Sequence, residues 1–155
     1  MEEYAKINII YEDNHLLVVE KPIYMPVCED ESKDDDLLTI LKNYIKDKYN
    51  KPGNVYLGLV HRLDRPVGGV MVFAKTSKAA ARLSKQITEK KFGKTYYAVT
   101  CGIIKNNGTL EDYLVKNEKK NISYVSDSKN GKYASLDYRV IDVRDNMSLV
   151  EIHLH

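Results

Sequence analysis

The stretch GLVHRLDRPVGG (residues 58–69) decides how this chain is interpreted. An apolar lead-in opens it and two glycines close it, so the pattern predicts a strand that enters a turn. The turn carries one carboxylate, Asp64, between Arg62 and Arg65, with His61 just before. Positive charge beside an aspartate favours its anion, and guanidinium groups bind phosphates through paired hydrogen bonds. The turn therefore offers a nucleophilic carboxylate and a clamp for a polyanion, although charged turns more often form only a local surface ion pair.

The composition is that of a folded protein. Of the 155 residues, 43% are hydrophobic and 30% are charged, which supplies enough apolar material for the core of one domain. No apolar stretch reaches the roughly 18 residues that a membrane span needs, and no secretion signal is visible. We therefore expect a cytoplasmic protein with no membrane partner. Cys28 and Cys101 lack the spacing of a zinc or redox site, so no metal is expected.

Charge is distributed unevenly along the chain. Residues 75–94 contain seven basic residues against one acid, whereas residues 29–36 contain six acids against one lysine. A basic block can neutralise phosphates and attract nucleic acid, although the same pattern is typical of a solvated helix face. The acidic stretch predicts a loop that nucleic acid would avoid.

The hydrophobic pattern predicts an α+β fold, with one mixed, mainly antiparallel sheet and two helices. Helices are expected at residues 37–49, capped by Asp36, and at residues 78–90, capped by Thr76 or Ser77. The expected strands cover residues 7–11, 16–20, 70–74, 94–101, 113–115, 122–125, 134–142 and 148–154. Of these, the strand at 113–115 is expected at a sheet edge. For the strand at 148–154 we expect either that it is an edge strand or that the chain is a fragment.

Three segments, in matching order and spacing, resemble the RluA family of RNA pseudouridine synthases. Residues 61–75 (HRLDRPVGGVMVFAK) resemble its signature turn, residues 21–27 (KPIYMPV) its early KP-x-G segment, and residues 94–102 (KTYYAVTCG) its K-x-Y-x-A…G strand. The chain departs from the family pattern at Tyr24, where a glycine is usual, and at residues 67–68, which are often Thr-Ser. The resemblance implies the pseudouridine synthase catalytic-domain fold, with no separate N-terminal RNA-binding domain.

The resemblance also implies a reaction and its residues. The family isomerises uridine to pseudouridine in ribosomal or transfer RNA: the N-glycosidic bond breaks, the base turns over, and carbon five rejoins the sugar. By this resemblance Asp64 is the catalytic aspartate, Tyr96 stacks near the target uracil, and Arg62 helps to hold the nucleotide out of its helix. No cofactor is implied. Whether Asp64 attacks the sugar or acts as a base and stabiliser stays open.

Further residues have two interpretations each. We expect Arg65, His61 and Lys94 to bind the substrate RNA. His61 can instead brace the turn by hydrogen bonding, and Lys94 can be a solvated charge. Tyr96 can instead be a core tyrosine, the usual place for this residue in a strand. Tyr97, its neighbour, is expected to face the opposite side of the strand.

The chain resembles only the first two-thirds of a catalytic domain. After a strand like residues 149–154 the family continues into a G-R-x-H-Q-I-R segment, which supplies a basic partner for the aspartate. We therefore expect little or no turnover from these 155 residues alone. The alternative function is a non-catalytic RNA-binding module that uses the same basic turn and helix. A carboxylate-dependent glycoside hydrolase is disfavoured, because no second carboxylate lies near Asp64 in the sequence.

Overall fold

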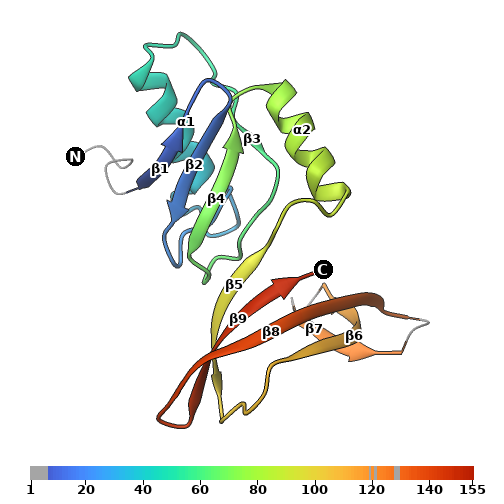
Figure 1. Cartoon of the computed structure of the whole chain (residues 1–155). Coiled ribbons are helices and arrows are strands. Elements are labelled where there is room, and N and C mark those ends of the chain that lie inside the picture. The colour runs from blue at the N-terminus through green and yellow to red at the C-terminus, as the bar shows by residue number, and fades with distance from the viewer. Residues whose placement is uncertain (1–6, 119, 121, 128–129) are drawn as a thin grey trace. The chain divides into compact units, whose positions relative to one another are not determined.

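A computed structural model describes residues 7–118, 120, 122–127 and 130–155, and the chain forms two compact units that meet in sequence between Glu89 and Lys90 (Figure 1). The expected α+β class, with two helices and antiparallel strand pairing, is confirmed. The strands form two separate sheets, however, and not the single sheet that the sequence suggested. No helix among these residues is long and apolar enough to cross a membrane.

The first unit contains a four-stranded antiparallel sheet in the order β1-β2-β4-β3. Its elements are β1 (Asn8–Glu12), β2 (Leu16–Lys21), α1 (Leu37–Lys48), β3 (Gly58–Leu59), β4 (Gly69–Ala74) and α2 (Ser77–Thr88). The hairpin of β1 and β2 follows the sequence prediction. The Asp13 carboxylate closes its turn, because it accepts the backbone N–H groups of His15 and Leu16 at 2.7 and 2.6 Å.

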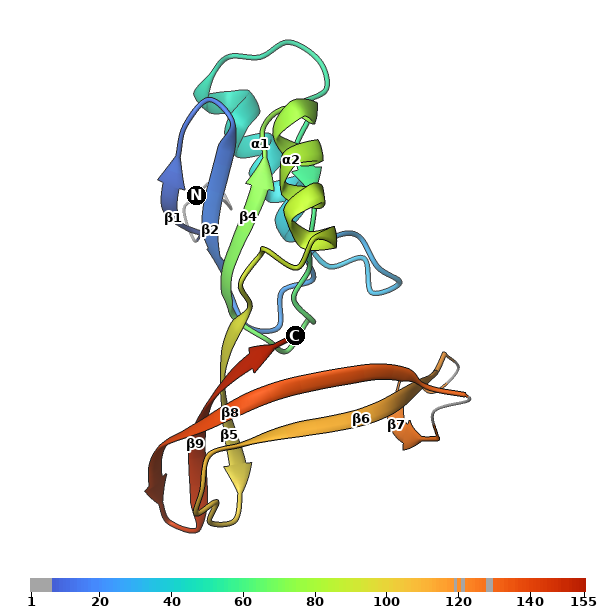
Figure 2. The same cartoon turned by 45° about the vertical axis from the view of Figure 1, so that its right-hand side comes forward.

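The core of this unit lies between the sheet and α1. Register pairs Leu17 with Phe73 and Val19 with Met71, so these side chains share one face, and all four are fully buried. The face of α1 that packs on them has the expected helical spacing and consists of Leu37, Ile40, Leu41 and Ile45. Figure 2 shows α2 beside β4, which it contacts together with β3.

Both helix starts agree with the expected caps. The Asp36 carboxylate accepts the backbone N–H of Thr39 at 3.0 Å, and the Thr76 hydroxyl accepts that of Ala79 at 3.2 Å. Thr76, and not Ser77, is therefore the cap of α2.

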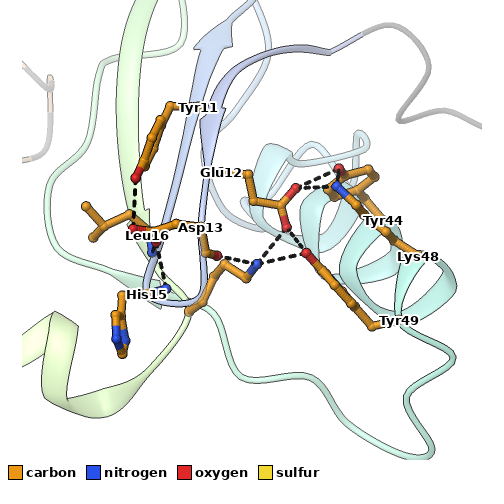
Figure 3. A network of polar contacts seen from close by, with 9 residues as sticks. Tyr11, Glu12, Asp13, His15, Leu16, Tyr44, Lys48 and Tyr49 are labelled. Carbon is orange, nitrogen blue, oxygen red and sulfur yellow. Dashed lines mark hydrogen bonds and ion pairs between the residues drawn. The ribbon is translucent and has the colours of Figure 1, made fainter.

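A polar network around Glu12 joins β1 to α1 and to the segment before α2 (Figure 3). The Glu12 carboxylate accepts hydrogen bonds from the Tyr44 hydroxyl (2.8 Å), the Lys48 ammonium (2.7 Å), the Tyr49 hydroxyl (2.7 Å) and the Lys75 ammonium (2.6 Å). Burial alone would raise the pKa of Glu12, but these four donors outweigh it and lower the pKa to about 2. The network therefore holds an ionised carboxylate whose side chain is only 8% exposed.

The second unit is a five-stranded antiparallel sheet in the order β5-β9-β8-β6-β7. Its strands are β5 (Thr95–Cys101), β6 (Gly108–Asn117), β7 (Ile122–Ser126), β8 (Lys132–Arg144) and β9 (Met147–Leu154). The edge position expected for residues 113–115 was wrong, because they belong to a longer strand, β6, that lies between β8 and β7. For the last strand the structure excludes the first of the two expected alternatives, since β9 lies between β5 and β8 and is not an edge (Figure 1).

Two neighbouring tyrosines of β5 have different partners across the sheet. Tyr97 lies opposite Glu151 on one face, and its hydroxyl donates to that carboxylate at 2.9 Å. Tyr96 lies opposite Ile152 on the other face, where the neighbouring pair brings in Val150. Because side chains alternate along a strand, Tyr96 and Tyr97 lie on opposite faces of the sheet, as expected.

Candidate active site

The turn between β3 and β4 is held from inside by a buried lysine. The Lys21 ammonium donates to the backbone carbonyls of Pro22 (3.0 Å), Arg65 (3.1 Å) and Val67 (2.6 Å), and the residue is only 1% exposed. Burial lowers the pKa of Lys21, while the negative charge of Asp64 opposes that change. Lys21 thus fixes the backbone on the C-terminal side of Asp64, and its charge interacts with that carboxylate.

The end of the turn needs glycine for two different reasons. A side chain at Gly68 would place its Cβ 2.9 Å from Cγ2 of Ile23 and 3.3 Å from the Lys21 carbonyl oxygen. Gly69 has φ of +143°, a conformation that other residues rarely adopt. The glycine where the family often has a serine therefore fits the close approach of Ile23 in this chain.

Asp64 itself is exposed on the turn, and its backbone carbonyl accepts the N–H of Val67 at 3.0 Å. The local ion pair that was the alternative interpretation of this turn is not formed: in the described part of the chain, no ion pair joins Asp64 to Arg62 or Arg65. The Arg62 guanidinium instead donates to the Cys28 thiol at 3.8 Å.

Arg65 turns toward the acidic loop. Its Nε donates to the Tyr24 carbonyl at 3.1 Å. Its Nη1 donates to the Ser32 hydroxyl at 2.9 Å and lies 3.5 Å from the Asp30 carboxylate. Its Nη2 forms an ion pair with the Asp34 carboxylate. We call these four contacts the Arg65 latch. The hydrogen bond from Arg65 also lowers the pKa of Asp34. Sequence reasoning missed the latch because its members come together only in the fold.

His61 faces the neighbouring strand. Its Nε2 accepts the backbone N–H of Val72 at 3.1 Å, which ties the turn to β4. The structure therefore shows the bracing contact that was the second interpretation of this residue. On this one turn the fold brings together His61, Arg62, Asp64 and Arg65, all placed by β3, β4 and Lys21.

The remaining two predicted site residues belong to the second unit. Tyr96 is half-buried in β5, and Lys94 lies just before that strand with an exposed side chain. The Lys94 carbonyl accepts the N–H of Leu154 at 3.2 Å, which extends the pairing of β5 with β9.

The basic block divides into structural and exposed residues. The Lys75 side chain is 8% exposed and bound to Glu12, so it serves the network of Figure 3. On α2, Lys78 and Arg82 are exposed, and Lys85 lies 3.7 Å from Glu89. The exposed basic residues of the block lie partly on α2 and partly after it, at Lys90, Lys91 and Lys94. Among the described residues, no group of three or more His, Cys, Asp or Glu side chains is arranged to hold a metal ion.

A family model for RNA pseudouridylate synthase matches residues 15–155, which include the Asp64 turn and β5. The chain belongs to the RNA pseudouridylate synthase family. The resemblance to its RluA branch is confirmed by curated relatives named ribosomal large subunit pseudouridine synthase D. The relative from Zymomonas mobilis is 34% identical over 152 residues, and the one from Pseudomonas aeruginosa is 32% identical over 140 residues.

These matches cover 96% and 88% of this chain but only 48% and 42% of the relatives, so the chain spans about half their length. A solved structure titled human RNA pseudouridylate synthase domain containing 4 shares the fold, with a TM-score of 0.78 at 23% identity. The structural match covers 95% of this chain and 58% of the human chain.

Proposed function

We propose that this chain carries the uridine-isomerising site of an RNA pseudouridine synthase that acts in the cytoplasm on ribosomal or transfer RNA. The observation that carries the proposal is an exposed aspartate on a turn that Lys21 and His61 brace, within a segment that the family model matches. The relatives named for ribosomal large subunit and transfer RNA support the substrate class.

The chemistry is an isomerisation in which nothing is gained or lost overall. The bond between N1 of uracil and C1′ of ribose breaks, a bond from C5 to C1′ forms, the C5 proton leaves, and N1 gains a proton. Asp64 is the group we assign to the sugar, either as nucleophile at C1′ or as stabiliser and base. This needs an exposed carboxylate that a flipped nucleotide can reach, and Asp64 is exposed on a braced turn.

Other residues receive supporting roles. We assign Tyr96 to stacking on the target uracil, and Arg62 to holding the nucleotide out of its helix. Lys94 and the exposed residues Lys78 and Arg82 of α2 are assigned to RNA phosphates. The reaction is proposed to need no metal and no cofactor.

The proposal is tested by tritium release from RNA labelled at C5 of uracil. We expect little or no release from the 155 residues alone, because they span about half the length of the curated relatives. The second enzyme form is this chain extended by the segment of the Zymomonas mobilis relative that follows the matched residues. Completion should give release, Asp64→Ala should abolish it while RNA binding persists, and Asp47→Ala, an exposed aspartate on α1, should leave it unchanged.

The outcomes separate the two candidate functions. Equal release by the parent and by Asp64→Ala would rule out the assigned role of Asp64. Salt-sensitive RNA binding without release from the completed chain would favour the non-catalytic RNA-binding module. Affinity that does not change with salt would contradict α2 as a phosphate-binding surface.

A further inference from the structure

We propose that Arg65 is a positioning residue, which fastens the acidic loop onto the turn that carries Asp64 and does not contact RNA. This inference rests on the proposed function for one point only, the catalytic role of Asp64. The sequence pattern suggested the opposite for Arg65, namely a phosphate contact beside the aspartate.

The first argument is the occupancy of the guanidinium. All three of its nitrogens are engaged in the Arg65 latch, and two carboxylates, those of Asp30 and Asp34, compensate its charge. A phosphate would have to displace them before it could bind. The contact described for Arg62 is with a thiol at 3.8 Å, so Arg62 is the better-placed guanidinium for RNA.

The second argument is that the acidic loop is built to present these carboxylates. The Asp30 side chain accepts both the backbone N–H (2.9 Å) and the hydroxyl (2.6 Å) of Ser32, and the Ser32 hydroxyl accepts the N–H of Asp34 at 3.2 Å. Three alternate residues of one short segment are thereby fixed on the side that faces Arg65. The loop is a preformed partner for the guanidinium.

The third argument is that the segment of Lys21 and Tyr24 and the Asp64 turn bind each other in both directions. The Lys21 side chain binds the Arg65 carbonyl at 3.1 Å, and the Arg65 side chain binds the Tyr24 carbonyl at 3.1 Å. Tyr24 has φ of +64°, the left-handed region that favours glycine, so its conformation needs support from its surroundings. Because Asp64 immediately precedes Arg65, both contacts fix the backbone from which the carboxylate projects.

The test is a double-mutant cycle read by hydrogen exchange in residues 24–34 and 61–68. Arg65→Gln should speed exchange in both segments by roughly fivefold, the size expected for an exposed ion-pair network. The double variant Asp30→Asn/Asp34→Asn should do the same, and adding Arg65→Gln to it should change little, since the partner is already lost. Arg82→Gln, which removes an exposed arginine on α2, is the matched control and should leave both segments as they are. Unchanged exchange in Arg65→Gln overturns the proposal.

A second measurement separates positioning from RNA contact. Arg65→Gln with Asp34→Asn removes one charge of each sign, so it leaves the net charge as it was. We expect the slope of log affinity against log salt to stay the same for this pair, while Arg62→Gln lowers it by roughly 0.7 to 0.9, the value of one phosphate contact. In the completed chain, the pair should lower kcat and leave KM unchanged. A fall in slope equal to that of Arg62→Gln overturns the proposal.

The charge-reversed double variant, Arg65→Asp with Asp34→Arg, should restore slow hydrogen exchange in residues 24–34 and 61–68. If the single variants had only lowered the general stability of the fold, the reversed pair would not restore it. If neither parent nor variants bind RNA, the proposed function fails, and the exchange cycle still decides whether the latch exists.

Discussion

Replacing Glu12 by glutamine tests the energetics of the network in Figure 3. The fall of the Glu12 pKa from its ordinary 4.5 to about 2 corresponds to about 3 kcal/mol of stability at neutral pH. A lowered pKa stabilises the fold above the unfolded value and loses that contribution as the pH falls through the folded value. The window is therefore from about pH 4.5 down to about pH 2.

The measurement is the free energy of unfolding of parent and Glu12→Gln from urea titrations, followed by NMR on amides of β1 and α1. We expect a difference of about 3 kcal/mol at pH 6, about 2 kcal/mol at pH 3.5, and about 1 kcal/mol or less at pH 2.5, where the parent carboxylate is itself becoming neutral. Other acids titrate over the same range, but they do so in both proteins and cancel in the difference.

Glu31→Gln, an exposed glutamate on the acidic loop, serves as the control and should change stability by less than about 0.5 kcal/mol at every pH. A difference between Glu12→Gln and the parent that stays constant from pH 6 to pH 2.5 would refute the reasoning. The carboxylate would then contribute by packing and not by charge.

Two further changes probe the segment that supports the turn. Lys21→Met should lower the free energy of unfolding by about 3 kcal/mol and speed hydrogen exchange at residues 64–68, because it leaves three carbonyls without their donor. Unchanged exchange there would contradict the bracing role. Tyr24→Gly should raise the free energy of unfolding by up to about 1 kcal/mol in thermal unfolding, because glycine adopts φ of +64° without strain. A loss of more than about 1 kcal/mol would show that the contacts of the tyrosine ring stabilise the fold by more than the backbone strain at this position destabilises it.

Local signals explain what could be predicted of the fold. The helix caps Asp36 and Thr76 and the hairpin turn at Asp13 depend on residues within three positions of one another, so the sequence contains all their information. The division into two sheets and the central place of β9 depend on pairings between distant segments. The alternation of residues along a strand predicts which side chains share a face, as it did for Tyr96 and Tyr97. It does not predict which strands lie on either side in the sheet.

The same distinction holds for the candidate site. The turn around Asp64 was identifiable because its residues are contiguous. The direction of the Arg65 side chain was not, because it depends on Asp30 and Asp34, about thirty positions earlier in the chain. Lys21 belongs to a segment that matched the family pattern, but its buried position could not be predicted, since lysine side chains are mostly exposed.

The place of β9 has a consequence for the newly made chain at the ribosome. All strands of the first sheet have been synthesised by residue 74, so that unit can assemble early. In the second sheet as described, β5 pairs only with β9, so β5 must wait until residues 147–154 emerge. During that interval both edges of β5 expose unpaired backbone groups beside Val99 and Tyr97, an arrangement that favours pairing with another chain.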